Sequence, residues 1–119
     1  MHIAGLSHIL LPESALCPDD ENKFKFADTA IETLVKSMEK HGCSRFRITA
    51  KIAGGACMFA STGINIGQRN VEVVKRELCR LNINLTGEDT GGNFGRTVDI
   101  NPENGTVTVK AIGKANREL

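Results

Sequence analysis

The chain has no tryptophan or tyrosine, and among its 119 residues only the five phenylalanines carry an aromatic benzene ring. Proteins that hold single-stranded nucleic acid stack its bases on aromatic rings, so this scarcity argues against nucleic acid as a partner. The net charge is only +1, which provides no overall field to attract a polyanion or an anionic membrane surface. The sequence therefore predicts no nucleic-acid partner.

Long apolar runs are also lacking. No segment approaches the roughly 20 apolar residues that a membrane-spanning helix needs. The first residues, MHIAGLSHILLPES, have neither the basic region nor the small-residue cleavage site of a signal peptide. We therefore expect a cytoplasmic protein with no membrane insertion.

Paired cysteines are absent as well. The four cysteines are irregularly spaced, with no CxxC pair, so a zinc site or a dithiol redox motif has little support. A disulfide framework is not expected in a chain with enough apolar residues for a core and no export signal. We expect free thiols, no metal and no cofactor. These cysteines are Cys17, Cys43, Cys57 and Cys79.

What is present is an ordinary globular composition, with 40% hydrophobic and 24% charged residues. The length favours a single domain over residues 1–119. Residues 13–25 are polar, acidic and without periodicity, so we expect a mobile surface loop. The polar tail, residues 113–119, is expected to fray.

Apolar periodicity predicts two helices. Residues 27–41 carry an apolar stripe at a 3.6-residue spacing, with Asp28 or Thr29 suited to the first turn and Gly42 to a left-handed C-terminal cap. Residues 68–81 repeat the pattern.

Alternation and turn residues predict the strands. Residues 2–11 are apolar and end at Pro12. Residues 45–52 alternate, with Phe46, Ile48, Ala50 and Ile52 on the face expected to be buried. The remaining strands are expected at residues 83–86, 97–100 and 106–112, the last two joined by the turn at 101–105.

The segment from Lys51 to Asn70 is rich in glycine and in residues that end or begin secondary structure. It leaves a strand through Gly54-Gly55 and enters the second helix, with Asn65 placed to cap that helix. Loops held on rigid elements often carry sites, but a tight strand-to-helix turn explains the same glycines. Spacing alone leaves both interpretations open.

Other chemical signals are few. His8 is a single histidine on an expected strand, and such residues are more often structural than catalytic. A second glycine-rich loop, residues 88–96, fits neither the P-loop nor the dinucleotide-binding pattern. Asp89 lies beside it, but one carboxylate does not make a cation site.

Four segments, in order, resemble the CheD family of chemoreceptor glutamine deamidases. They are HILLP at residues 8–12, KIAGGACMF at 51–59, NIGQRN at 65–70 and EDTGGNFGR at 88–96; FADTA at 26–30 also fits.

The resemblance implies an α/β (α+β) fold, a three-layer α/β/α sandwich with mixed and antiparallel strands and two main helices. It implies hydrolysis of glutamine side chains to glutamate on the cytoplasmic helices of chemoreceptors, and a CheC-type phosphatase as a second partner. The chemistry uses a cysteine thiolate as nucleophile and a histidine that activates it, and it needs no cofactor.

His8 matches the histidine of that family's site. The resemblance puts the nucleophilic cysteine and an assisting threonine upstream of it, and the printed sequence contains neither. We therefore expect the natural domain to begin earlier, with further N-terminal strands; the alternative is a binding module without chemistry. None of the four cysteines is expected to substitute. Substrate-binding roles are expected for Gly54, Gly55 and Arg69, and docking of the second helix is the alternative for Arg69. Asn70 is expected to be structural.

Overall fold

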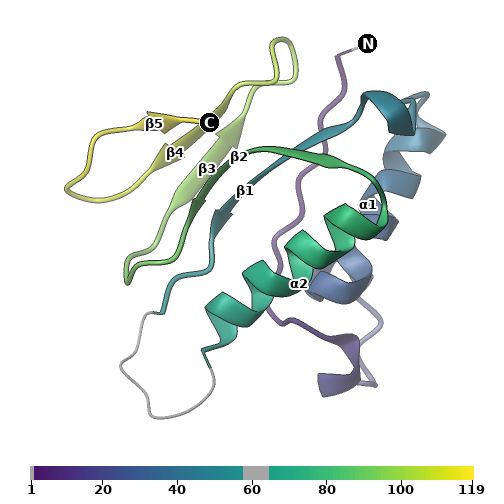
Figure 1. The fold of residues 1–119 in the computed structure, drawn as a ribbon, viewed down its shortest axis with the longest axis horizontal. Coiled ribbons are helices and arrows are strands. Elements are labelled where there is room, and N and C mark those ends of the chain that lie inside the picture. The colour runs from purple at the N-terminus through teal and green to yellow at the C-terminus, as the bar shows by residue number, and fades with distance from the viewer. Residues whose placement is uncertain (1, 58–64) are drawn as a thin grey trace.

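The computed structural model describes residues 2–57 and 65–119, and these form an α+β fold (Figure 1). The expected class, with mixed strands and two main helices, is confirmed. Both helices lie to one side of the parallel strands in the described part of the chain. The elements are α1 (Ala27–Lys40), α2 (Ile66–Arg80), β1 (Thr49–Gly54), β2 (Asn84–Thr90), β3 (Thr97–Ile100), β4 (Val107–Lys110) and β5 (Arg117–Glu118).

Helix α1 covers the range predicted from its apolar stripe. Its N-cap residue, Phe26, makes no side-chain cap, and Asp28 accepts hydrogen bonds from the backbone N and the Oγ of Ser14 instead. Gly42 follows the helix with a φ of 97°, the left-handed conformation expected of a C-terminal glycine. The Asp28 contacts fasten the preceding segment to the start of α1.

That preceding segment, residues 13–25, contains two short 3₁₀ turns, Ser14–Leu16 and Lys23–Lys25. Lys25 pairs with Asp20 at 2.7 Å, and this hydrogen bond lowers the pKa of the Asp20 carboxyl from its ordinary value. The segment therefore has internal structure, and its mobility stays a prediction.

Strands β1 and β2 are parallel and are joined through α2. Pairing begins at Thr49 with Asn84, so the expectation of a strand from Arg45 was wrong for residues 45–47, which form a 3₁₀ turn. Phe46, expected on the buried face, is almost fully exposed at 99%. The reason is that β2 begins only at Asn84, so among the described residues no strand pairs with the chain before Thr49.

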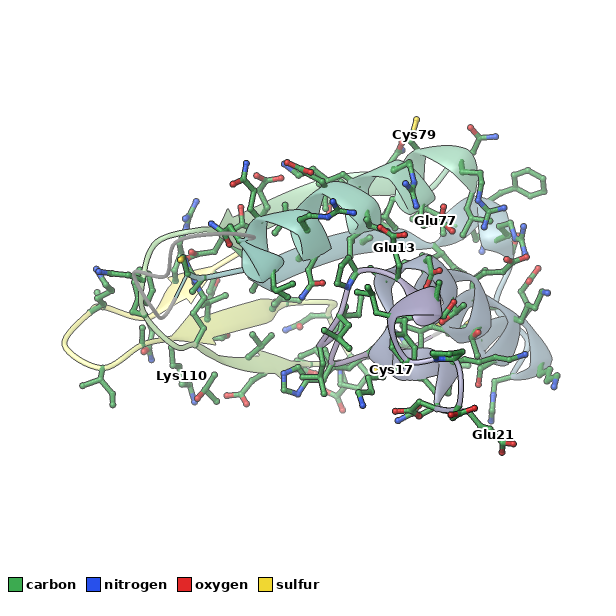
Figure 2. All side chains as sticks on the ribbon, turned by 90° about the horizontal axis from the view of Figure 1, so that it is seen from below. Glu13, Cys17, Glu21, Glu77, Cys79 and Lys110 are labelled. Atoms are coloured by element: carbon green, nitrogen blue, oxygen red, sulfur yellow. The ribbon has the colours of Figure 1, made fainter. Side chains whose placement is uncertain are left out.

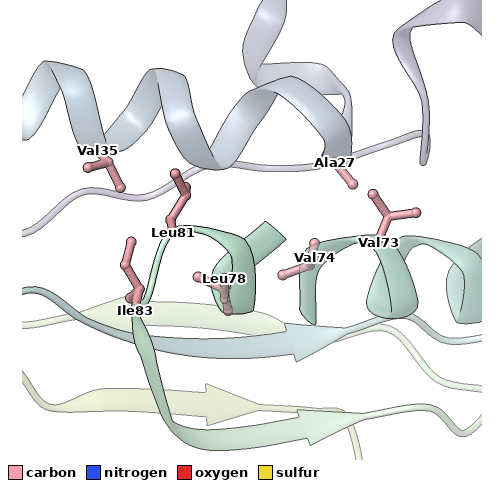
Figure 3. Packing of buried hydrophobic residues seen from close by; sticks show 7 residues of the cluster. All are labelled: Ala27, Val35, Val73, Val74, Leu78, Leu81 and Ile83. Atoms are coloured by element: carbon pink, nitrogen blue, oxygen red, sulfur yellow. The ribbon is translucent and has the colours of Figure 1, made fainter. Parts of the chain in front are cut away.

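The main core lies between the helices and these two strands (Figure 3). Ala27 and Val35 of α1 face α2, and Ile83 joins them from the turn that leads into β2. Ile48, Ala50 and Ile52 pack against this cluster as their alternation predicted. The remaining members of the buried cluster are Val73, Val74, Leu78 and Leu81.

The N-terminal segment is not the strand that its apolar residues suggested. Residues 2–10 belong to no strand, and only Leu11 forms an isolated parallel bridge, with Phe26. The segment packs on a helix instead: a Cβ added at Gly5 would lie 2.8 Å from Leu34 and 3.0 Å from Met38 of α1. No strand in the described residues runs beside it, so a ladder cannot form.

Strands β3, β4 and β5 form an antiparallel sheet. The turn predicted between β3 and β4 is present, with Gly105 at a φ of 72°. The strand expected over 106–112 is shorter than predicted, and Ile112 is fully exposed. The tail expected to fray contains β5, which pairs with β4 through Arg117 and Glu118.

The exit of β1 and the start of α2 approach each other at backbone level. A Cβ on Gly67 would lie 2.5 Å from the carbonyl oxygens of both Ala56 and Gly55, and one on Gly55 would lie 2.4 Å from Val71. Real Cβ atoms do not approach so closely, so this contact requires glycine on both sides. The Gly55–Gly67 contact fixes where α2 begins relative to β1.

Replacing Asn65 tests the helix cap that the sequence predicted. The Asn65 Oδ1 accepts a hydrogen bond from the Gln68 backbone N at 3.0 Å. Asn65→Ala should lower the free energy of unfolding by about 1 kcal/mol, measured by urea denaturation, because that amide loses its partner. Asn65→Asp keeps an acceptor and should stay near wild type; equal losses for both variants would contradict the cap.

Replacing Gly67 tests the backbone contact. Helix propensity alone predicts that Gly67→Ala stabilises α2 by up to about 1 kcal/mol. The contact with Ala56 and Gly55 predicts the opposite sign, a destabilisation of about 1–3 kcal/mol in urea denaturation. Gly95→Ala is the matched control, because no described atom lies within 4 Å of its added Cβ. A stabilised Gly67→Ala protein would show that the contact is absent.

Candidate active site

The two glycine-rich segments singled out in the sequence meet at one end of the parallel strands. The Gly91 N donates to the Gly54 carbonyl oxygen and the Cys57 N donates to the Gly92 carbonyl oxygen, each at 2.9 Å. Gly54, Gly91 and Gly92 all have positive φ, at 109°, 85° and 71°. Three residues without side chains thus take part in the contact between the two segments. Met58, Phe59 and Gly63 of the first segment lie outside the described residues.

A buried ion pair holds the second glycine-rich loop on β2. The Arg96 side chain is 3% exposed, and its guanidinium lies 3.0 Å from the Asp89 carboxylate and 4.1 Å from the centre of the Phe94 ring. Arg117 of β5 approaches the same carboxylate at 3.4 Å. Sequence reasoning treated Asp89 only as a single cation ligand. The signal for the pairing was the opposite charge at the two ends of EDTGGNFGR.

His8 is exposed and makes no hydrogen bond or ion pair with any described residue. The segment that carries it is nevertheless held. The Ser7 Oγ donates to the Phe24 carbonyl oxygen at 2.9 Å, and the Leu10 N donates to the Lys25 carbonyl oxygen at 2.8 Å. An accessible imidazole on a fixed backbone is suited to exchanging protons with a bound molecule.

The first turns of α2 also hold the His8 segment. The Arg69 guanidinium pairs with the Glu13 carboxylate, and the Asn70 Nδ2 donates to the Leu10 carbonyl oxygen at 3.3 Å. Glu13 lies against α2 in Figure 2. Arg69 was expected to bind substrate, and its contact here is with the protein's own chain.

Gly55 and the chain that follows His8 both contact α2, whereas Gly54 bonds to the second glycine-rich loop. In the described part of the chain no hydrogen bond joins His8 to Gly54, Gly55 or Arg69. Gly55 packs on α2, and Arg69 extends from it to the chain that follows His8. Their substrate-binding roles stay predictions.

The four cysteines lie on different parts of the chain. Figure 2 shows Cys79 projecting outward from α2, whereas Cys17 lies on the loop before α1. Within residues 2–57 and 65–119 no cysteine bonds to His8, and no three His, Cys, Asp or Glu side chains are grouped to hold a metal ion. Neither described helix is long and apolar enough to span a membrane.

Comparison with known proteins identifies the family. Residues 10–111 match the family described as CheD chemotactic sensory transduction. His8 lies two residues before this range. The match includes both glycine-rich segments and the Asn65–Asn70 motif.

Named relatives cover nearly all of the chain. The "probable chemoreceptor glutamine deamidase CheD" of Caldanaerobacter subterraneus is 49% identical over 93% of this chain and 71% of its own length. The "chemoreceptor glutamine deamidase CheD" of Halalkalibacterium halodurans is 43% identical over 98% and 75%, and that of Thermotoga maritima is 47% identical over 93% and 69%. Identity of this extent, together with the family match over residues 10–111, places the chain in the CheD family.

Proposed function

We propose that this chain is the glutamine deamidase domain of a chemotaxis system, converting glutamine side chains of chemoreceptors to glutamate. The observation that carries the proposal is the likeness to relatives named for this activity, at 43–49% identity over 93–98% of the chain. The exposed His8 on a fixed segment supports it, because hydrolysis of an amide requires a group that moves protons.

The reaction is a hydrolysis in two steps. A cysteine thiolate attacks the carbon of the glutamine carboxamide; the C–N bond then breaks, and a proton delivered to nitrogen lets ammonia leave. Water next attacks the thioester carbon, the C–S bond breaks, and the products are glutamate and the restored thiol. The sum is amide plus water giving carboxylate plus ammonium, which needs neither oxidant nor cofactor.

His8 is the group we assign to the proton transfers. An imidazole takes a proton from the thiol, returns it to the leaving nitrogen and then takes one from water, since histidine changes charge near neutral pH. The resemblance puts the nucleophilic cysteine upstream of His8, in a glycine-rich turn assisted by a threonine. The four cysteines of the printed sequence are not assigned this role.

The glycine-rich backbone is the surface we assign to substrate. Amides near Gly54 and Gly55 are suited to donate to the oxyanion that forms when the carboxamide is attacked. The partners proposed are the helices of chemoreceptor cytoplasmic regions and a CheC-type phosphatase, which places the protein in the cytoplasm.

A binding module without chemistry is the second candidate. Such a protein would occupy chemoreceptors or the phosphatase while leaving the glutamines unchanged.

Replacing His8 separates the two candidates. The protein purified from its native cell is incubated with a chemoreceptor cytoplasmic fragment, and conversion of glutamine to glutamate is followed by peptide mass spectrometry with ammonia release. His8→Ala, made in that full gene product, should lower the rate by about 10²- to 10⁴-fold, the usual contribution of a general acid–base group.

His41→Ala is the matched control, because His41 directly follows α1 and its Nδ1 bonds to the Ser37 carbonyl oxygen of that helix. It should retain wild-type activity. Binding of the fragment by the wild-type protein without any conversion would favour the binding module and overturn the deamidase proposal. Undiminished activity in His8→Ala would remove His8 from the mechanism.

A further inference from the structure

We infer that Asn70 is a positioning residue that fixes the backbone behind His8. This inference rests on the proposed function, since it assigns Asn70 a part in the same site. It is carried by the contact between the Asn70 amide and the Leu10 carbonyl group, two residues after His8. Asn70 is not assigned a contact with any reacting atom. It acts through the backbone that carries the His8 imidazole.

The orientation of the Asn70 amide follows from its partner. The Nδ2 donates to the Leu10 carbonyl oxygen at 3.3 Å. A carbonyl oxygen can only accept, so turning the amide over would set two acceptors against each other. The contact therefore needs a side chain that donates from this position on α2.

The segment beside His8 is held from the opposite side by the chain before α1. The Leu10 N and the Leu11 N both donate to the Lys25 carbonyl oxygen, at 2.8 and 3.2 Å, and the Ala27 N donates to the Leu11 carbonyl oxygen at 2.9 Å. With Asn70 in place, Leu10 is held by two backbone groups: its N–H donates to Lys25 before α1, and its C=O accepts from Asn70 of α2. Removing the Asn70 donor leaves this peptide attached on one side only.

The second contact from α2 to this segment is a solvent-exposed ion pair. Arg69 and Glu13 form an ion pair whose side chains are 48% and 41% exposed, and such exposed pairs contribute little. The Asn70 contact lies closer to His8 along the chain. We therefore assign the positioning of His8 chiefly to Asn70.

The other end of the same amide indicates that Asn70 serves placement more than stability. Its Oδ1 is buried and has no hydrogen-bond partner among the described residues. A buried acceptor without a donor is unfavourable, which offsets what the bond to Leu10 contributes. Replacing Asn70 should therefore change activity more than it changes the free energy of unfolding.

The test uses two variants of the full gene product, Asn70→Asp and Asn70→Ala. Aspartate keeps the shape but turns an oxygen toward the Leu10 carbonyl, and alanine removes the donor together with the unpaired acceptor. Each should lower kcat for deamidation by about 10- to 100-fold, the cost of a displaced catalytic group, with KM nearly unchanged. Asn65→Asp, at the N-cap of the same helix and with the cap retained, should keep wild-type kcat.

Two further measurements distinguish positioning from general structural damage. In the double variant Asn70→Ala/His8→Ala the rate should fall no further than in His8→Ala alone, because Asn70 acts only through His8. Hydrogen exchange should be faster at the Leu10 and Leu11 amides in Asn70→Ala, while the amides of β4 keep their protection. Additive losses in the double variant, or unchanged exchange at Leu10, would overturn the inference.

The outcome also separates this inference from the proposed function. If the wild-type protein converts no chemoreceptor glutamine, the proposed function fails, and the exchange rates alone decide whether Asn70 fixes the segment. If the wild type is active and both Asn70 variants keep its kcat, the function stands and the positioning role is wrong.

Discussion

The contact between Gly55 and Gly67 is the constraint on which the arrangement of this end of the molecule depends. It lets the chain leave β1 and return as α2 with the two backbones touching. Two further attachments near the candidate site are made to these elements. The second glycine-rich loop bonds to the Gly54 carbonyl oxygen, and the His8 segment bonds to Asn70. A side chain at either glycine would separate β1 from α2 and displace both attachments.

Helix α2 therefore links stability to the site. Its buried face supplies Val73, Val74 and Leu78 to the core, while its first turns contact the segments from which the site is built. Near its other end, Arg80 pairs with Glu77 of its own helix and with Glu32 of α1. Glu77 is only 6% exposed, so this pairing also satisfies a buried carboxylate. Placement of α2 by α1 and by β1 positions the first turns of α2, which contact both the glycine-rich turn and the His8 segment.

Local signals in the sequence predicted the local features correctly. Apolar periodicity predicted both helices, Asn65 predicted the cap of α2, and the turn at 101–105 predicted the hairpin. The failures are all questions of pairing. The N-terminal residues are apolar enough for a strand, but they pair with no strand in the described residues. Residues 45–47 come before Thr49, the first residue of β1 that pairs with β2. Which segment lies beside which is decided by tertiary structure, which composition and periodicity do not contain.

The same distinction between local features and tertiary contacts applies to the candidate site. Its residue types could be named from the sequence and the family resemblance, but the contacts that hold them could not. Arg96 and Asp89 are seven positions apart, on either side of a glycine-rich turn, and no periodic pattern links them. Asn70 and Leu10 are separated by 60 residues. The relatives identify the family, and only the folded chain shows which side chains hold the site together.

The parallel pairing of β1 and β2 has a consequence for the order in which the chain folds. These strands meet only after the intervening chain, α2 included, has closed a long loop, because Thr49 pairs with Asn84. The hairpin of β3 and β4 closes over a short turn, and such hairpins form within about 1–10 μs. In non-local parallel pairing, the entropy of closing the loop is lost before the strand contacts can stabilise the chain. We therefore expect the glycine-rich end of the molecule to be assembled late in folding, after the hairpin and the two helices have formed.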